Sequence, residues 1–252
     1  MLLEGKNAVI YGAGGSIGGA VARAFASEGA HVFLAGRTLA KLDAVAGEIR
    51  SAGGVAETAE VDALDEKAVD EHADRVAAEA GSIDVSFNLI THPSVHGTPM
   101  AEMAVEDYMV SVVTAVRTTF LTARAAARHM IGQGSGVLLF FGGSGEPMRD
   151  YYIGGTQVAF DAVESIRRQL AAELGPHGIR TVTLKTGGIP ESIPESVPGR
   201  EEIVERHIVP PTMLGRAATL EDVGNVAAFV ACDRAQTMTA ATVNISCGAL
   251  VD

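Results

Sequence analysis

Short apolar stretches alternate with longer segments of helical period along the whole chain. The apolar stretches predict seven strands, over Asn7–Tyr11, His31–Ala35, Val55–Val61, Asp84–Ile90, Val137–Phe141, Ile179–Lys185 and Thr242–Ser246. The segments between them predict helices over Ser16–Glu28, Leu39–Ser51, Glu66–Ala80, Val105–Ile131, Gly155–Leu174 and Leu220–Cys232. Strands that alternate with helices in this way predict a parallel sheet joined by right-handed crossovers.

The predicted strand Val137–Phe141 is apolar at every position. Such a strand is buried on both faces, as in a parallel sheet that helices cover on each side. The length of 252 residues is compatible with one large domain of this type. We therefore predict an α/β fold, a single doubly wound Rossmann-type domain over residues 1–252. Its seven-stranded, mainly parallel sheet would be flanked by helices on both faces.

One irregular stretch, residues 188–215, follows the predicted strand Ile179–Lys185. It is punctuated by prolines at Pro190, Pro194, Pro198, Pro210 and Pro211. Connections of this length in a compact domain usually have a function. This one leaves the carboxyl end of the sheet, where doubly wound folds bind ligands. We predict a mobile substrate lid; the alternative is a passive surface loop.

Composition narrows the range of partners. The formal net charge of -12 disfavours nucleic acid and anionic membranes, which both require a basic surface. The two cysteines, Cys232 and Cys247, match no metal-ligand spacing and no CxxC redox motif. The sequence has no leader pattern and no apolar run of membrane-spanning length. We expect a soluble cytoplasmic protein with a small-molecule ligand and no metal site.

A glycine-rich turn separates the first predicted strand from the first predicted helix. It contains Gly12, Gly14, Gly15, Ser16, Ile17 and Gly18. Glycines at such a turn let the backbone approach a pyrophosphate, and the helix N-terminus offers unpaired N–H groups to the phosphates. Because the turn has the required strand-turn-helix context, it predicts a dinucleotide site.

The end of the second predicted strand indicates which dinucleotide is bound. A carboxylate at this point would hold the ribose 2′-hydroxyl of NAD(H), but Gly36 provides none. Arg37 instead provides a forked cation suited to a phosphate, beside Thr38, and Lys41 follows one helical turn later. We predict that NADP(H) is preferred and that NAD(H) remains possible; the alternative is that Arg37 only caps a surface loop.

These motifs resemble the short-chain dehydrogenase/reductase (SDR) family, and the resemblance covers essentially the whole chain. Gly12, Gly14 and Gly18 match the family's TGxxxGIG motif, and the segment Leu170–Arg180 is typical of the family. The resemblance implies further cofactor contacts. They would come from Asp62, Asn88 and Ile189, which match an adenine-contacting Asp, the first Asn of the Asn-Asn-Ala-Gly motif and a nicotinamide contact.

The resemblance also implies an Asn-Ser-Tyr-Lys tetrad, which this chain lacks. Ala115, Gly143, Thr156 and Phe160 stand at the four positions. In the family the Tyr exchanges a proton with the substrate oxygen, the Lys lowers the pKa of that Tyr, and the Ser orients the oxygen. A Phe at the Lys position removes the positive charge that would activate a phenol.

Four residues are candidates for the missing catalytic groups. Tyr152 precedes the Lys position, in an arrangement similar to that of the enoyl-reductase branch of the family. Ser144 and Thr156 supply hydroxyls, and Lys185 at the end of a strand supplies a cation. The alternatives are that Tyr152 packs on the lid and that Lys185 is a partly exposed strand-end residue.

Two histidines, His92 and His96, follow Asn88 and are further candidate acids, or else solvated loop residues.

The first functional hypothesis is an NADP(H)-dependent SDR-type oxidoreductase that acts on a small carbonyl, alcohol or enoyl substrate with a non-standard proton donor. The second is a catalytically silent dinucleotide-binding protein, either a sensor or a partner subunit. A structural protein without cofactor is disfavoured by the glycine-rich turn. The resemblance implies a homotetramer or homodimer that forms through the helices Val105–Ile131 and Gly155–Leu174.

Overall fold

The computed structural model describes residues 1–143, 152–197 and 199–251. Its strands form one sheet in the order β3-β2-β1-β4-β5-β6-β7, and every paired strand is parallel to its neighbours. The strands are β1 (Asn7–Tyr11), β2 (His31–Gly36), β3 (Val55–Glu60), β4 (Val85–Asn88), β5 (Gly136–Gly142), β6 (Ile179–Lys185) and β7 (Ala241–Asn244). The predicted doubly wound α/β fold is therefore confirmed.

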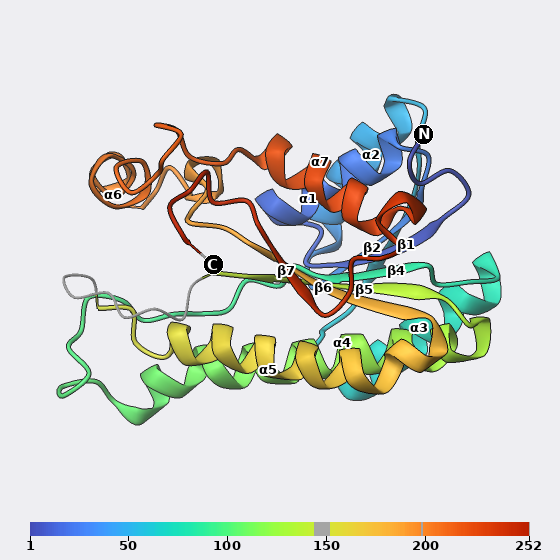
Figure 1. Ribbon diagram of the computed structural model, residues 1–252, viewed down its shortest axis with the longest axis horizontal. Coiled ribbons are helices and arrows are strands. Elements are labelled where there is room, and N and C mark those ends of the chain that lie inside the picture. The colour runs from blue at the N-terminus through green and yellow to red at the C-terminus, as the bar shows by residue number, and fades with distance from the viewer. Residues whose placement is uncertain (144–151, 198, 252) are drawn as a thin grey trace.

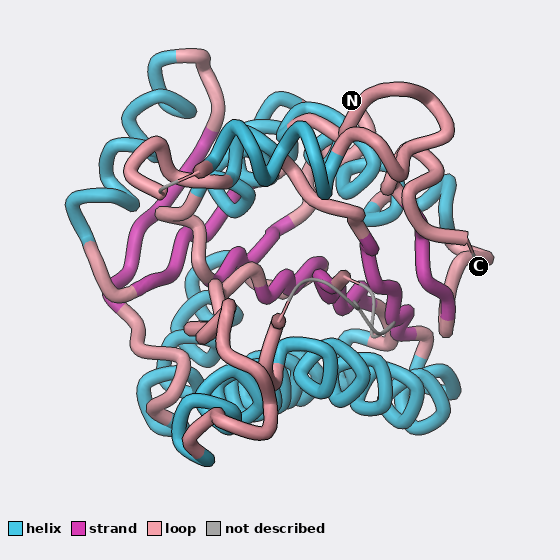
Figure 2. Tube along the Cα trace, turned by 90° about the vertical axis from the view of Figure 1, so that its left-hand side faces the viewer, coloured by secondary structure: helices cyan, strands magenta, loops and turns pink. Residues whose placement is uncertain are grey.

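Helices cover both faces of this sheet, giving three layers (Figures 1 and 2). One face carries α1 (Ser16–Ser27), α2 (Leu39–Ser51) and α7 (Leu220–Ala231). The other face carries α3 (Glu66–Ala80), α4 (Val105–Gln133) and α5 (Thr156–Leu174). In the described part of the chain, no helix has the length and apolar character needed to cross a membrane.

Two strands end earlier than predicted, for the same reason. The side-chain oxygen of Asn88 accepts a hydrogen bond from the N–H of Ile90 at 3.0 Å, and that of Asn244 accepts one from Ser246 at 3.1 Å. An Asn that bonds its own backbone two residues later turns the chain out of the extended conformation. Apolar composition alone extended both predicted strands past these turns.

A buried polar cluster fixes α5 to the sheet. The carboxylate of Glu164 forms an ion pair with Arg167 at 2.9 Å and accepts hydrogen bonds from Thr183 of β6 and Thr242 of β7. Burial opposes ionisation of Glu164, but the Arg167 guanidinium and the two hydroxyls hold its pKa below the ordinary value. This cluster sets the position of the α5 face that borders the site.

The strand order reverses at β1, which lies between β2 and β4. A crevice forms outside the carboxyl ends of the strands at such a switch point, and doubly wound folds bind ligands there. α1 begins directly after the carboxyl end of β1, and it packs so closely on α7 that a Cβ on Gly224 would lie 2.8 Å from the Ala24 Cβ. The fold therefore holds a helix N-terminus rigidly at the crevice.

The stretch 188–215 is more regular than the sequence suggested. It contains the short helical segments η2 (Pro190–Ser192), α6 (Arg200–Ile203) and η3 (Val204–Ile208). Further single turns, η1 (Gly175–His177) and η4 (Asp233–Ala235), follow α5 and α7. We call residues 188–215 the lid segment.

Candidate cofactor and substrate site

The glycine-rich turn after β1 is closely packed. Gly12 has a φ of +80°, and its N–H donates to the Ala35 carbonyl at 2.8 Å. A Cβ on Gly12 would lie 2.5 Å from the Leu89 carbonyl oxygen, and one on Gly18 would overlap the Gly12 oxygen. Only glycine therefore allows the turn to pass between β4 and α1 in this form. The turn is built as the cradle that a pyrophosphate requires.

A first cavity of about 240 Å³ lies beside this turn, at the ends of β1 and β2. Gly12, Gly14, Gly15, Arg37, Thr38 and Lys41 are among its lining residues. Arg37 and Lys41 are the charged side chains of its described lining, which includes no carboxylate. In a chain of net charge -12, the described lining of this cavity is therefore locally cationic.

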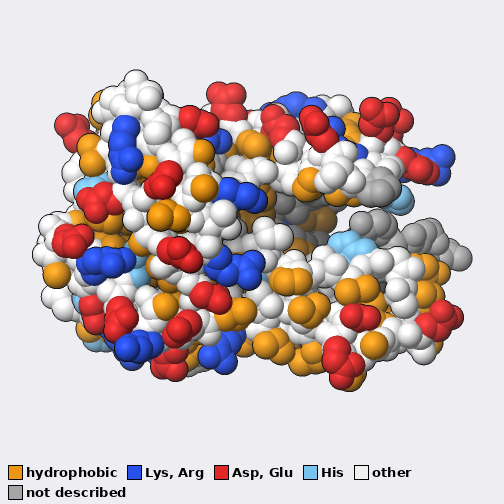
Figure 3. All heavy atoms as spheres, turned by 180° about the vertical axis from the view of Figure 1, so that it is seen from behind, with side chains coloured by type: hydrophobic (Ala, Val, Ile, Leu, Met, Phe, Trp, Pro, Cys, Tyr) orange, Lys and Arg blue, Asp and Glu red, His pale blue; other side chains and the backbone are white. Residues whose placement is uncertain are grey.

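A second cavity of about 610 Å³ adjoins the first, because Leu89, Ile90 and Thr91 line both. Its other walls come from β4, β5, α5 and the lid segment. Figure 3 shows the molecule hollowed between its two helix layers, with hydrophobic side chains inside the hollow and a histidine at its edge. The two cavities form one track along the carboxyl edge of the sheet.

Of the remaining predicted cofactor residues, only Ile17 and Asn88 line this track. Ile17 and Asn88 line the second cavity, and Ser16 begins α1. Asp62 is exposed and its carboxylate accepts a hydrogen bond from the Leu64 N–H at 3.0 Å, while its neighbours Val61 and Ala63 line the first cavity. Ile189, near the start of the lid segment, is buried in the hydrophobic core and lines neither cavity.

The amide group of Asn88 is held by the protein. Its nitrogen donates to the Thr118 and Thr119 hydroxyls of α4 at 3.2 and 3.4 Å. Its oxygen accepts from the Ile90 N–H. Asn88 therefore ties the end of β4 to α4 and shapes the floor of the second cavity.

Two tetrad positions contact each other. A Cβ on Gly143 would lie 2.7 Å from Cε2 and 3.0 Å from Cζ of the Phe160 ring. The ring therefore occupies the space that a side chain at position 143 would need. Ala115, at the Asn position, is fully buried in α4. The positions at which the resemblance implies a Ser and a Lys are thus in contact, and the aromatic ring fills the space beside Gly143.

The predicted catalytic residues are only partly brought together. Thr156 lines the second cavity, and its hydroxyl lies 3.4 Å from Nε2 of His96. Tyr152 is 48% exposed, and its carbonyl accepts from the Gly97 N–H at 2.8 Å. Lys185 is the last residue of β6, and its backbone is in register with Gly142 of β5 and Asn244 of β7. Tyr152 and Lys185 are described residues but are not part of the second cavity's lining, whereas Ser144 lies outside the described residues.

Both candidate histidines line the second cavity. Burial lowers the pKa of His92 to about 4 and lowers the pKa of His96 below its ordinary value. Both imidazoles are therefore neutral at pH 7.

Sequence reasoning missed the apolar wall that α5 presents to this cavity. Thr156, Phe160 and Val163 form that wall, and their spacings of four and three residues mark one helix face. That periodicity was available as a signal, but only the structure shows that this face borders the cavity, where Val163 also belongs to the core.

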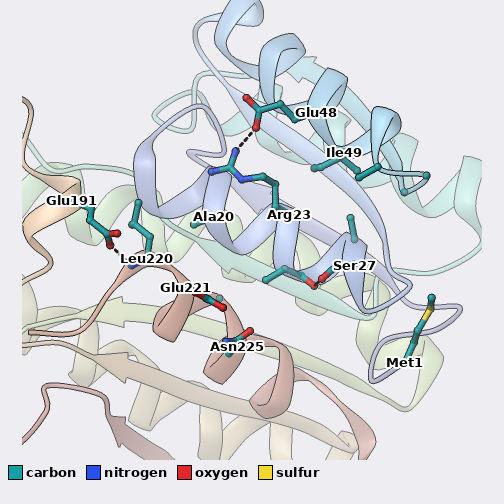
Figure 4. A pocket seen from close by; sticks show the side chains of 16 residues that line it. Met1, Ala20, Arg23, Ser27, Glu48, Ile49, Glu191, Leu220, Glu221 and Asn225 are labelled. Carbon is teal, nitrogen blue, oxygen red and sulfur yellow. Dashed lines mark hydrogen bonds and ion pairs between the residues drawn. The ribbon is translucent and has the colours of Figure 1, made fainter.

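The lid segment is braced by bonds within it and tied to α7 by one further bond. Arg200 donates to the carbonyls of Ile193 at 3.0 Å and Pro190 at 3.2 Å. The Glu191 carboxylate accepts from the Leu220 N–H at 2.6 Å, at the N-terminus of α7 (Figure 4). The Arg200 bonds brace the lid segment internally, and the Glu191 bond joins it to α7.

Figure 4 also shows a separate cavity of about 640 Å³ on the outer face of α1, α2 and α7. Arg23 and Glu48 form an ion pair of 2.9 Å across it. Its described lining shares no residue with the two cavities of the crevice.

Within residues 1–143, 152–197 and 199–251, no group of three or more His, Cys, Asp or Glu side chains is placed to hold a metal ion.

Comparison with known proteins agrees with this geometry. Residues 12–249 match the family model described as enoyl-(acyl carrier protein) reductase. The chain is 31% identical over 255 residues to the oxidoreductase asL5 of Sarocladium schorii, covering 98% of this chain and 96% of that one. It is 27% identical over 248 residues to a D-threitol dehydrogenase of Mycolicibacterium smegmatis, covering 98% and 93%.

A solved short-chain type dehydrogenase/reductase from Mycobacterium marinum superimposes with a TM-score of 0.87 at 28% identity, covering 99% of this chain and 97% of that one. The fold, the glycine-rich turn and these matches over almost the full length lead to one conclusion. The chain belongs to the short-chain dehydrogenase/reductase family and is an oxidoreductase of that type.

Proposed function

We propose that this protein is an NADP(H)-dependent oxidoreductase that interconverts a small carbonyl or enoyl compound and its reduced form. The observation that carries the proposal is the track of two joined cavities at the switch point, with the glycine cradle at one end and an apolar pocket at the other. Such a track suits a dinucleotide whose reactive end must meet a second molecule.

The first cavity supports the preference for NADP(H). Arg37 and Lys41 line it and no carboxylate of its described lining opposes them. Gly12, Gly14 and Gly15 would leave room for the pyrophosphate, and the α1 N-terminus would offer it N–H groups. The bound nicotinamide would supply the hydride. The protein would position and orient the two reactants and exclude water.

The proton must come from this chain or from solvent. Reduction of a carbonyl adds a hydride to carbon and a proton to oxygen. Thr156 Oγ1 borders the cavity within 3.4 Å of His96 Nε2. In our proposal Thr156 passes its proton to the substrate oxygen and recovers one from solvent through His96. Tyr152, Ser144 and Lys185 remain alternative contributors.

A catalytically silent dinucleotide-binding protein is the second candidate. The observation that favours it is the Phe160 ring, which lines the cavity and fills the space beside Gly143. A site adapted only for binding has no need of the displaced polar groups.

We further propose that residues 1–252 act as one cytoplasmic dinucleotide-binding domain with a lid at 188–215, assembled as a homodimer or homotetramer. Exposed hydrophobic residues on α4 support this assembly, because Met109, Val113, Phe120 and Ile131 share one stripe of that helix.

The test is NADPH oxidation by the purified protein with a panel of carbonyl and enoyl compounds. Thr156→Val should lower kcat by about 100-fold or more, the size of a general-acid contribution, without loss of NADPH affinity. Tyr152→Phe is the matched variant, and it should retain kcat. A loss confined to Tyr152→Phe would assign the proton to the phenol. NADPH binding without turnover of any compound would favour the silent protein.

A further inference from the structure

The second cavity has no formally charged side chain in its described lining. None of these residues is Asp, Glu, Lys or Arg, although the chain contains 31 acidic and 19 basic residues. The titratable groups there are His92 and His96, and burial keeps both neutral at pH 7 by lowering their pKa values. A carboxylate or phosphate on a substrate would lose its hydration there without gaining a partner from these walls.

Several of the polar side chains in the cavity already have partners in the protein. The Asn88 amide bonds to α4 and to its own backbone. The Ser192 hydroxyl donates to the Ile189 carbonyl at 2.7 Å. A sugar or polyol, which needs a partner for each hydroxyl, would compete with these bonds. The Thr156–His96 pair is positioned to receive one substrate oxygen.

Apolar groups form two facing walls. Phe160 and Val163 of α5, with Phe141 of β5, make the wall on the sheet side. Ile193 and Val197 make the wall on the lid side. Because Phe160 replaces a cation with a flat ring, it turns the polar centre expected for the family into an apolar surface.

The lid segment is itself two-sided. Glu191 and Glu195 are exposed, while Ile193 and Val197 are half-buried against the cavity. The bonds from Arg200 to the lid backbone hold this orientation. The lid segment therefore closes the site with apolar side chains and keeps its carboxylates in solvent.

We propose that the site takes an uncharged, largely apolar ring compound, a ketone of about the size of a substituted cyclohexanone or the matching alcohol. Its ring lies between Phe160 and the lid residues Ile193 and Val197, and its oxygen lies at the Thr156–His96 pair. A cavity of about 610 Å³ is within the range of small-molecule sites. This proposal names a substrate class for the proposed oxidoreductase and so rests on that function.

The test is ligand-observed saturation-transfer NMR on the full chain, with and without NADPH. The probes are methylcyclohexanone, the cyclohexanone carboxylate of similar size, and a ketose sugar. The neutral ring ketone should bind at least about tenfold more tightly than the other two, because only it avoids an unpaired polar group. Equal or tighter binding of the carboxylate or the sugar would overturn the proposal.

A pair of variants locates the binding. Val197→Asp places a charge in the lid wall and should weaken ketone binding by about tenfold or more, whereas Ser196→Asp changes an exposed neighbour and should leave it within about twofold. Calorimetry should give the same NADPH affinity for both variants, which shows that they are folded. Unchanged ketone binding in Val197→Asp would overturn the proposal. Ketone binding by a protein that binds no NADPH would leave this pocket assignment standing and remove the proposed function.

Discussion

The contact between Gly143 and Phe160 makes a quantitative prediction about Gly143→Ala. An added Cβ would lie 2.7, 3.0 and 3.2 Å from three atoms of the ring, well inside normal carbon–carbon contact. Overpacking of this kind typically costs about 1–3 kcal/mol. Replacing glycine with alanine at a compatible backbone position gives back about 0.4–1 kcal/mol through the unfolded state.

Gly47→Ala is the matched control. Gly47 lies in α2, and a Cβ there would meet nothing within 4 Å. It should stabilise the protein by about 0.4–1 kcal/mol. Urea unfolding should therefore place Gly143→Ala about 1–3 kcal/mol below Gly47→Ala. In a Phe160→Ala background that gap should close, giving a coupling energy of similar size.

One way for the ring to relieve the overlap is to swing further into the second cavity, which it already lines. In that case Gly143→Ala would keep its stability but lose binding of the neutral ring ketone. The reasoning fails if Gly143→Ala is as stable as Gly47→Ala and still binds the ketone normally. It also fails if Gly143→Ala is destabilising and the loss persists unchanged in the Phe160→Ala background.

Three further predictions follow from individual contacts. Arg37→Ala should weaken NADPH binding by about 10–100-fold, the range for one charge-assisted bond, and leave NADH binding unchanged; Lys67→Ala, on the exposed side of α3, is the calorimetric control. Burial lowers the pKa of His72 to about 4, so the unfolded chain takes up this proton first as the pH falls below about 6.5. The free energy of unfolding should therefore decrease between pH 6.5 and 4, by up to about 1.4 kcal/mol per pH unit for this group. The His72→Gln variant should reduce that slope, whereas the control His177→Gln, which alters an exposed residue, should not. Glu191→Ala should speed amide hydrogen exchange in the lid segment and at Leu220, because it removes the bond that joins them, while Glu195→Ala, which alters an exposed side chain, should not.

The sequence predicted the fold well because its signals are local and repeated. Strands such as Asn7–Tyr11 and helices such as Leu39–Ser51 were predicted to the residue, since hydrophobic period and turn residues agree there. The early ends of β4 and β7 were not predicted, because they depend on where an Asn side chain points. A pattern of residue types does not contain that orientation.

The site was predictable in part for the same reason. The glycine-rich turn is a backbone motif, and its steric need for Gly12 and Gly18 follows from the strand-turn-helix sequence. The contact between Gly143 and Phe160 joins two elements through the tertiary fold, so the sequence showed two separate positions where the structure shows one contact. Likewise, Thr156 and His96 are far apart in the chain, and only the fold brings them within 3.4 Å.

Calorimetric titration of the purified full chain with NADPH and with NADH tests the central claim most directly. The account predicts that both bind and that NADPH binds at least about tenfold more tightly, because Arg37 and Lys41 line the first cavity without an opposing carboxylate in its described lining. Failure to bind either dinucleotide would contradict it, and would mean that the glycine cradle serves only to close the fold.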